Sequence, residues 1–142
     1  MLEAHELRVG DQFDVDWRLS ADWAEEQKLR TERNQLIMEK LQAGKTVAIR
    51  RWSGWSLYPR VWSNDLCIFA PVCFGYEVQE GDIVFCKAQP QGQYDAYLAR
   101  GMEWNYPQHA WVYWISTLSS PPKATGFCYL THICGKLVHV LK

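Results

Sequence analysis

Short β-prone segments separated by turn-forming residues fill the sequence from residue 46 onward, and this spacing constrains the fold more than any other feature. The turn-prone stretches at 89–92, 105–107 and 119–122 each contain proline or glycine. Several short strands in such close succession indicate a mainly β fold, with a coiled, mainly antiparallel and partly barrel-like sheet. The expected strands are 46–49, 65–70, 82–88, 94–100, 110–118 and 132–141.

A helix is expected ahead of these strands. Residues 12–19 alternate between apolar and polar side chains, which is typical of a half-buried strand. Ser20 or Asp22 can then cap the start of a helix, and Gly44 is expected to end it. The apolar positions expected near one face of this helix are Leu29, Leu36, Ile37 and Leu41.

The length of 142 residues fits a single compact domain. Within it, residues 1–45 form a strand and a helix that pack on the core or are appended to it, and residues 46–142 form the β domain. The sequence therefore predicts an α+β protein that is mainly β, with one N-terminal helix.

The net charge and the cysteine content indicate which cellular environment and which partners suit the chain. The formal net charge of −1 gives no general attraction to nucleic acid, so we do not expect nucleic acid as a partner of this domain. Five cysteines without a Cys-x-x-Cys motif indicate reduced thiols, as in a soluble cytoplasmic protein. No apolar run approaches the roughly 20 residues that a membrane-spanning helix needs, so we expect no transmembrane segment.

Ser56 lies in a strand-to-turn segment with features of a nucleophile site. The β-branched run 46–49 leads into Ser53 and Gly54, where glycine permits a sharp turn, and Pro59 fixes the backbone beyond the serine. A serine held on such a turn stands clear of its strand, beside free backbone amides that can stabilise an oxyanion. The alternative is a serine that only serves the turn.

The motif Gly54-x-Ser56-Leu57-x-Pro59 resembles the nucleophile box of the LexA-like and signal-peptidase-like serine peptidases, which use a Ser-Lys dyad. Leucine stands here where the family has methionine. The resemblance spans roughly residues 46 to 140. It is also carried by Asn64-Asp65 and Gly81-Asp82 ahead of two strands, where the family has Gly-Asp, and by the closing run Gly135-Lys136-Leu137-Val138.

The resemblance places the general base on the strand 94–100, and there the sequence departs from the family. Ala99 occupies the position of the base, followed by Arg100, and an alanine cannot take a proton from Ser56. The chain is then a natural pseudo-peptidase, an engineered variant without its base, or an enzyme with a base elsewhere. The alternative bases are Lys87, His109 and His132.

If Ser56 is a nucleophile, the amides of Ser56 and its neighbours form the oxyanion pocket and the side chain of Ser53 can donate to it; otherwise Ser53 and Gly54 serve the turn. The resemblance implies that an extended peptide, or a segment of the chain itself, lies along a strand edge near the serine, and this binding survives loss of the base. No cofactor is expected. The competing hypothesis is a non-catalytic protein-interaction module that uses a tryptophan-rich surface and the N-terminal helix.

Two further patterns bear on binding. Cys128, His132 and Cys134 would share one face of a continuous strand and could ligate zinc, although a flat strand suits tetrahedral coordination poorly and cysteines are often simply buried. We therefore expect no metal site. The segment 111–115 carries aromatic residues on both alternating faces, which is typical of a central strand or of an interface.

Overall fold

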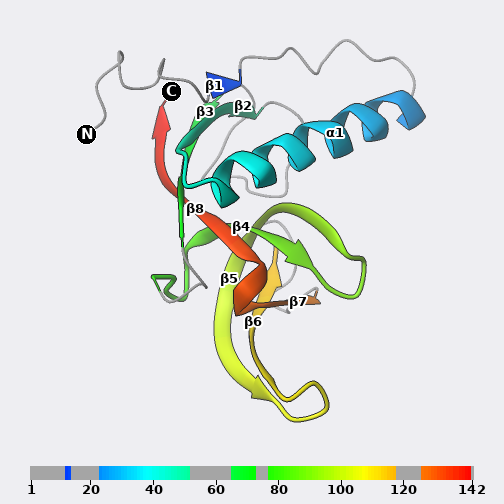
Figure 1. Cartoon of the computed structure of the whole chain (residues 1–142), viewed down its shortest axis with the longest axis vertical. Coiled ribbons are helices and arrows are strands. Elements are labelled where there is room, and N and C mark those ends of the chain that lie inside the picture. Colours follow the sequence, from blue (N-terminus) through cyan, green and yellow to red (C-terminus); the bar gives the residue numbers. More distant parts are fainter. Residues whose placement is uncertain (1–11, 14–22, 52–64, 73–76, 118–125, 142) are drawn as a thin grey trace.

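The computed structural model of the chain describes residues 12–13, 23–51, 65–72, 77–117 and 126–141. Figure 1 shows a strongly curved sheet with one helix packed against it. No helix of the described residues is both long and apolar enough to cross a membrane. The elements are β1 (Gln12–Phe13), α1 (Trp23–Gln42), β2 (Val47–Arg51), β3 (Asp65–Pro71), β4 (Ile83–Ala88), β5 (Gln93–Asn105), β6 (Ala110–Ser116), β7 (Gly126–Tyr129), a 3₁₀ helix (Leu130–His132) and β8 (Ile133–Leu141).

The strands form a single sheet in the order β1-β2-β3-β8-β4-β5-β6-β7. Strands β2 to β8 pair antiparallel, and the two-residue strand β1 joins β2 in parallel. Strand β8 lies between β3 and β4 and pairs with both. The predicted mainly β class with one N-terminal helix is therefore confirmed.

The part of the sheet from β4 to β7 curls so far that the end of β7 lies beside the end of β4. Just beyond β4, Gln89 and Phe127 exchange backbone hydrogen bonds of 2.7 and 3.2 Å, so the ends of β4 and β7 are joined. Gly126 makes this approach possible, because any Cβ at that position would collide with the carbonyl oxygen of Gln89. Strands β4 to β7 thus form the partly closed, barrel-like unit that the sequence predicts.

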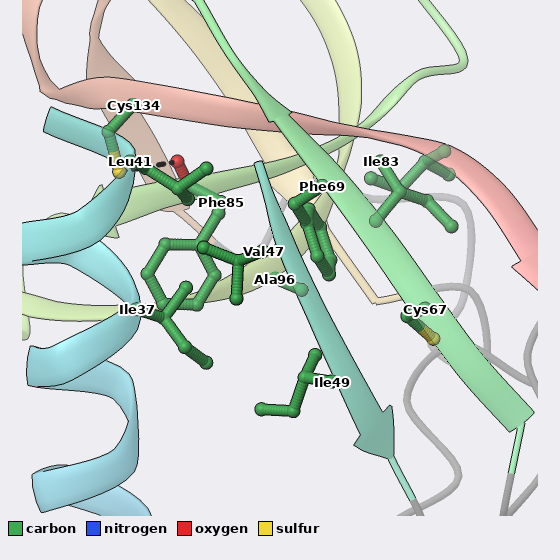
Figure 2. Close-up of a cluster of buried hydrophobic side chains, with 11 residues drawn as sticks. Ile37, Leu41, Val47, Ile49, Cys67, Phe69, Ile83, Phe85, Ala96 and Cys134 are labelled. Atoms are coloured by element: carbon green, nitrogen blue, oxygen red, sulfur yellow. Dashed lines mark hydrogen bonds between the residues drawn. The ribbon is translucent and has the colours of Figure 1, made fainter. Parts of the chain in front are cut away.

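Two hydrophobic clusters occupy opposite faces of β4, because successive side chains of a strand alternate between its faces. Ile83 and Phe85 belong to the cluster that includes Ile37 of α1, while Val84 and Cys86 belong to the cluster inside the curled unit. Figure 2 shows side chains from the helix and several strands meeting on the first face. The helix-side cluster contains Ile37, Leu41, Val47, Ile49, Cys67, Phe69, Ile83, Phe85, Ala96, Leu98 and Cys134, and the barrel-side cluster contains Val78, Val84, Cys86, Ala88, Ala99, Tyr113, Ile115, Cys128, Leu130 and Ile133.

Helix α1 ends as the sequence predicts. Gly44 has a φ of 83°, the amide of Gly44 donates to the carbonyl of Leu41 at 3.0 Å, and the amide of Lys45 donates to the carbonyl of Lys40 at 3.1 Å. These two bonds define a Schellman cap, which needs a residue in the left-handed conformation and therefore favours glycine. The end of the helix is thus fixed by local sequence.

The buried face of α1 differs from the prediction at one position. Arg33, Ile37 and Leu41 are buried at four-residue spacing, whereas Leu36 is 46 % exposed. Successive helix positions are 100° apart, so Leu36 points away from the sheet once Ile37 points toward it. The expectation that Leu36 belongs to the buried face is wrong.

The strand limits also differ in places. Strand β5 runs on past residue 100 to Asn105, because Arg100 is the extra residue of a β-bulge that lets pairing with β6 continue. Strand β7 and the 3₁₀ helix were not predicted. Of the strand expected at 12–19, only β1 falls on described residues.

Candidate functional site

The predicted nucleophile segment lies outside the described residues. This applies to Ser56 and to the neighbouring Ser53, Gly54 and Pro59. The site therefore has to be built from the parts of the sequence pattern that the structure describes.

Ala99 is packed inside the barrel-side cluster with only 1 % of its surface exposed. Its amide donates to the carbonyl of Asp82 at 2.8 Å, and its carbonyl accepts from the amide of Gly81 at 2.8 Å. The Gly81-Asp82 step and the strand of Ala99 are thus directly joined. Gly81 has a φ of 96°, and the Asp82 carboxylate accepts from the amide of Gln79 at 2.8 Å, so the step forms a constrained turn. Asp65, the other motif aspartate, is buried at the first position of β3.

Lys87 and His132, two of the alternative bases, lie near each other, whereas His109 is exposed in the turn between β5 and β6. Burial lowers the pKa of His132, and the positive charge of Lys87 lowers it further. The ring of His132 packs edge-on against Tyr129 at 5.4 Å, and its Nδ1 atom is buried without a hydrogen-bond partner among the described residues. A neutral imidazole is thus favoured there.

The cysteine–histidine pattern does not form a metal site. Cys128 points into the barrel-side cluster, whereas Cys134 points into the helix-side cluster and donates a hydrogen bond to the carbonyl of Phe85 at 3.3 Å. The 3₁₀ helix at 130–132 interrupts the strand, so the three side chains do not share a face. No group of three metal-ligating side chains occurs in the part of the chain that the structure describes.

A polar groove lies between α1 and the first half of β5. It has a volume of about 350 Å³, and its walls combine neutral polar side chains with one carboxylate. The lining residues are Thr31, Asn34, Gln35, Gly92, Gln93, Tyr94, Asp95, Ala96, Tyr97 and Thr117.

The floor of this groove is a strand edge. Strand β4 pairs with β5 from Gln93 to Leu98, but β6 pairs with β5 only from Leu98 onward. Among the described residues, no strand lies on the second side of β5 between Gln93 and Tyr97. An open edge in a sheet is a template for adding another strand.

The backbone groups that face the groove follow from the alternation of an antiparallel strand, in which each residue directs its N–H and C=O to the same side. Both groups of Ala99 bond toward the β4 side, and the carbonyl of Tyr94 bonds away from it, to Asn34. The backbone groups of Tyr94 and Ala96 therefore point into the groove.

Two side chains cap this edge. The Nδ2 of Asn34 donates to the carbonyl of Tyr94 at 2.9 Å, and the Oδ1 of Asp95 accepts from the amide of Ala96 at 2.8 Å. Arg33 is 3 % exposed and donates to the Oδ1 of Asn34 from Nε at 3.1 Å and from Nη2 at 3.0 Å. Because Arg33 occupies the amide oxygen of Asn34, the amide nitrogen is turned toward Tyr94.

Several large side chains, most of them aromatic, gather at the end of the hairpin formed by β5 and β6. Trp104 packs edge-on against Trp111 at 5.6 Å and against Tyr106 at 6.3 Å. Met102, Tyr106 and Trp111 are large and exposed. We call Met102, Trp104, Tyr106 and Trp111 the aromatic tip.

The groove was not predicted from the sequence. Its caps come from α1 and β5, and Asn34 and Tyr94 are 60 residues apart in the chain. The only available signal was the polar character of the helix near residue 34 and of Gln93 and Asp95 in an otherwise apolar sheet. Comparison with known protein families, with characterised proteins and with solved structures gives no match for this chain.

Proposed function

We propose that this domain binds an extended peptide by adding it as a strand to the open edge of β5, and that it does so without cleaving it. The observation that carries the proposal is the polar groove, whose floor presents backbone groups of Tyr94 and Ala96. Backbone groups on a strand edge recognise the main chain of an extended peptide, while the groove walls contact its side chains.

The proposal fits the peptidase resemblance in its non-catalytic form. Ala99 is buried among apolar side chains, so the position where the resemblance places the base holds no proton acceptor. Peptide binding by strand addition requires a strand edge and a groove and uses no nucleophile. A pseudo-peptidase that retains its peptide-binding mode is consistent with these features.

The experiment starts from a displayed library of random nine-residue peptides. The strongest binder is synthesised with blocked ends, and its Kd is measured by calorimetry. Each of its amides is then methylated in turn, which removes one backbone donor at a time. We expect losses of about tenfold at every second residue within the bound stretch, because alternate residues of a strand face the partner edge.

Two variants locate the binding site. Gln35→Trp fills the groove and should weaken binding at least tenfold, whereas Leu36→Trp places the same ring on the exposed neighbour outside the groove and should leave the Kd unchanged. Ser56→Ala should also leave the Kd unchanged, and mass spectrometry should show the peptide intact after incubation. Equal sensitivity to methylation at consecutive amides, or equal effects of the two tryptophan variants, would contradict the proposal.

The aromatic tip supports a second candidate function, the docking of a protein partner. Exposed, adjoining aromatic side chains are typical of contact surfaces in proteins. Trp111→Ala should abolish such an interaction and leave binding of the nine-residue peptide unchanged. The reverse result would assign the peptide to the tip instead of the groove.

A further inference from the structure

Asp95 and Asn34 occupy the backbone groups that an added strand would need. The side chain of Asn34 donates a hydrogen bond to the carbonyl of Tyr94, and the side chain of Asp95 accepts one from the amide of Ala96. A peptide that pairs with this edge must supply a donor to that carbonyl and an acceptor to that amide, so it competes with both side chains.

The two caps lie on different faces of β5. Ala96 belongs to the helix-side cluster, so the side chains at even positions of this stretch face α1. Asp95 pairs with Cys86 of the barrel-side cluster and therefore faces the other way. Side chains of an added strand would alternate in the same manner, between the neutral wall formed by Thr31, Asn34 and Gln35 and the carboxylate of Asp95.

We propose that the β5 edge is held in a self-capped state by Asn34 and Asp95, and that it opens preferentially to extended peptides with a lysine or arginine on the Asp95 face. This inference rests on the proposed peptide-binding function. When the peptide takes the amide of Ala96, the Asp95 carboxylate loses a hydrogen-bond donor. A basic side chain next to it on the same face replaces that donor and its favourable electrostatic interaction.

The inference assigns Asp95 two separable roles. Its Oδ1 competes with the peptide for the amide of Ala96, and its charge selects the peptide side chain. Asp95→Asn keeps an oxygen acceptor but removes the charge, whereas Asp95→Ala removes both. The two variants therefore distinguish competition from selection.

The experiment uses the blocked nine-residue peptide that the library selection provides, in a series with lysine or glutamine at each position in turn. For the unsubstituted domain, lysine at one position, or at two positions separated by one residue, should bind about threefold more tightly than glutamine. In Asp95→Asn this ratio should fall to about one. Asp95→Ala should bind each glutamine-substituted peptide of the series about two- to tenfold more tightly than the unsubstituted domain does, because one competitor is gone.

Urea unfolding of each variant checks that the fold is intact, and Glu32→Gln, which removes a neighbouring exposed charge of α1, is the matched control that should leave the lysine preference unchanged. A lysine preference that survives in Asp95→Asn, or tighter binding that is absent in Asp95→Ala, overturns the inference. With either result the proposed function is retained if methylation still weakens binding at every second amide. Loss of that alternation counts instead against strand addition itself.

Discussion

Burial of a single thiol, that of Cys134, makes the stability of the fold depend on pH in the alkaline range. Burial in the helix-side cluster raises its pKa from an ordinary 9.0 to about 12, and the thiol donates to the carbonyl of Phe85 (Figure 2). The folded protein thus holds this proton more tightly than the unfolded chain does. The resulting stabilisation is fully present below pH 9 and is lost as the pH rises toward 12.

We expect the free energy of unfolding to fall above pH 9, by up to about 1.4 kcal/mol per pH unit from this thiol. Cys134→Ala should show a shallower decline, with the remainder coming from Cys86, Tyr94 and Tyr113, whose pKa values burial also raises. Urea unfolding in reducing buffer from about pH 7 to 11 measures both slopes. Equal slopes would mean that Cys134 titrates alike in both states.

Ala99 provides a second test at the scale of one residue. Ala99→Lys would place an ammonium group inside the barrel-side cluster, where 1 % of the native side chain is exposed. An unpaired buried charge costs at least about 3 kcal/mol, so we expect a large loss of unfolding free energy and no self-cleavage by mass spectrometry. Ala110→Lys, at the half-buried start of β6, should be tolerated. A stable Ala99→Lys protein that cleaves itself would instead support the peptidase alignment.

Among the elements, the contact between β4 and β7 depends on one glycine. Gly126→Ala would drive its Cβ into the carbonyl of Gln89 and break the backbone bridge that joins the two strands. We expect a loss of about 1–3 kcal/mol in unfolding free energy. Hydrogen exchange of the Gln89 and Phe127 amides should accelerate.

Gly101→Ala is the matched control for this prediction. Gly101 also lies in a strand, but a Cβ there meets no atom within 4 Å. We expect a change within about 0.5 kcal/mol. Similar losses in the two variants would show that strand entropy, and not the close approach to Gln89, decides the outcome.

The docking of α1 is tested by two adjacent apolar residues. Ile37 is 2 % exposed within the helix-side cluster, and Leu36 is 46 % exposed. Ile37→Ala should lower the unfolding free energy by about 2–5 kcal/mol, whereas Leu36→Ala should cost less than about 1 kcal/mol. Thermal or urea unfolding compares them directly. A larger effect at Leu36 would place the other face of the helix against the sheet.

The elements that local chemistry determines could be predicted from the sequence. Turn residues bound β4 and the start of β5, and Gly44 ends α1, because each acts within a few residues of the boundary it sets. Strand β7 was missed because four residues are too few to show alternation, and its pairing with β6 and Gln89 depends on distant parts of the chain. The wrong expectation for Leu36 has a similar cause, because a helical pattern does not indicate which of two adjacent apolar residues packs against the sheet.

At the scale of the whole molecule, the candidate site depends on sheet order, which no local pattern records. The groove exists because β6 pairs with only part of β5 while α1 passes beside the remainder. Cys128 and Cys134 lie on opposite sides of the sheet for a related reason, because the 3₁₀ helix interrupts the continuous strand that would have placed them on one face. Residue types were readable from the sequence, but their spatial neighbours were not.

Strand β8 also determines when the two halves of the sheet can join. It follows every other described strand in the chain, yet it lies between β3 and β4 and is the only strand that links the two halves of the sheet. On a translating ribosome, β2 with β3 and the unit from β4 to β7 can each begin to form, but they have to wait for residues 133–141 before they join. Until then the edges of β3 and β4 stay unpaired. A chaperone that binds the nascent chain during this interval would have its largest effect on whether the chain folds.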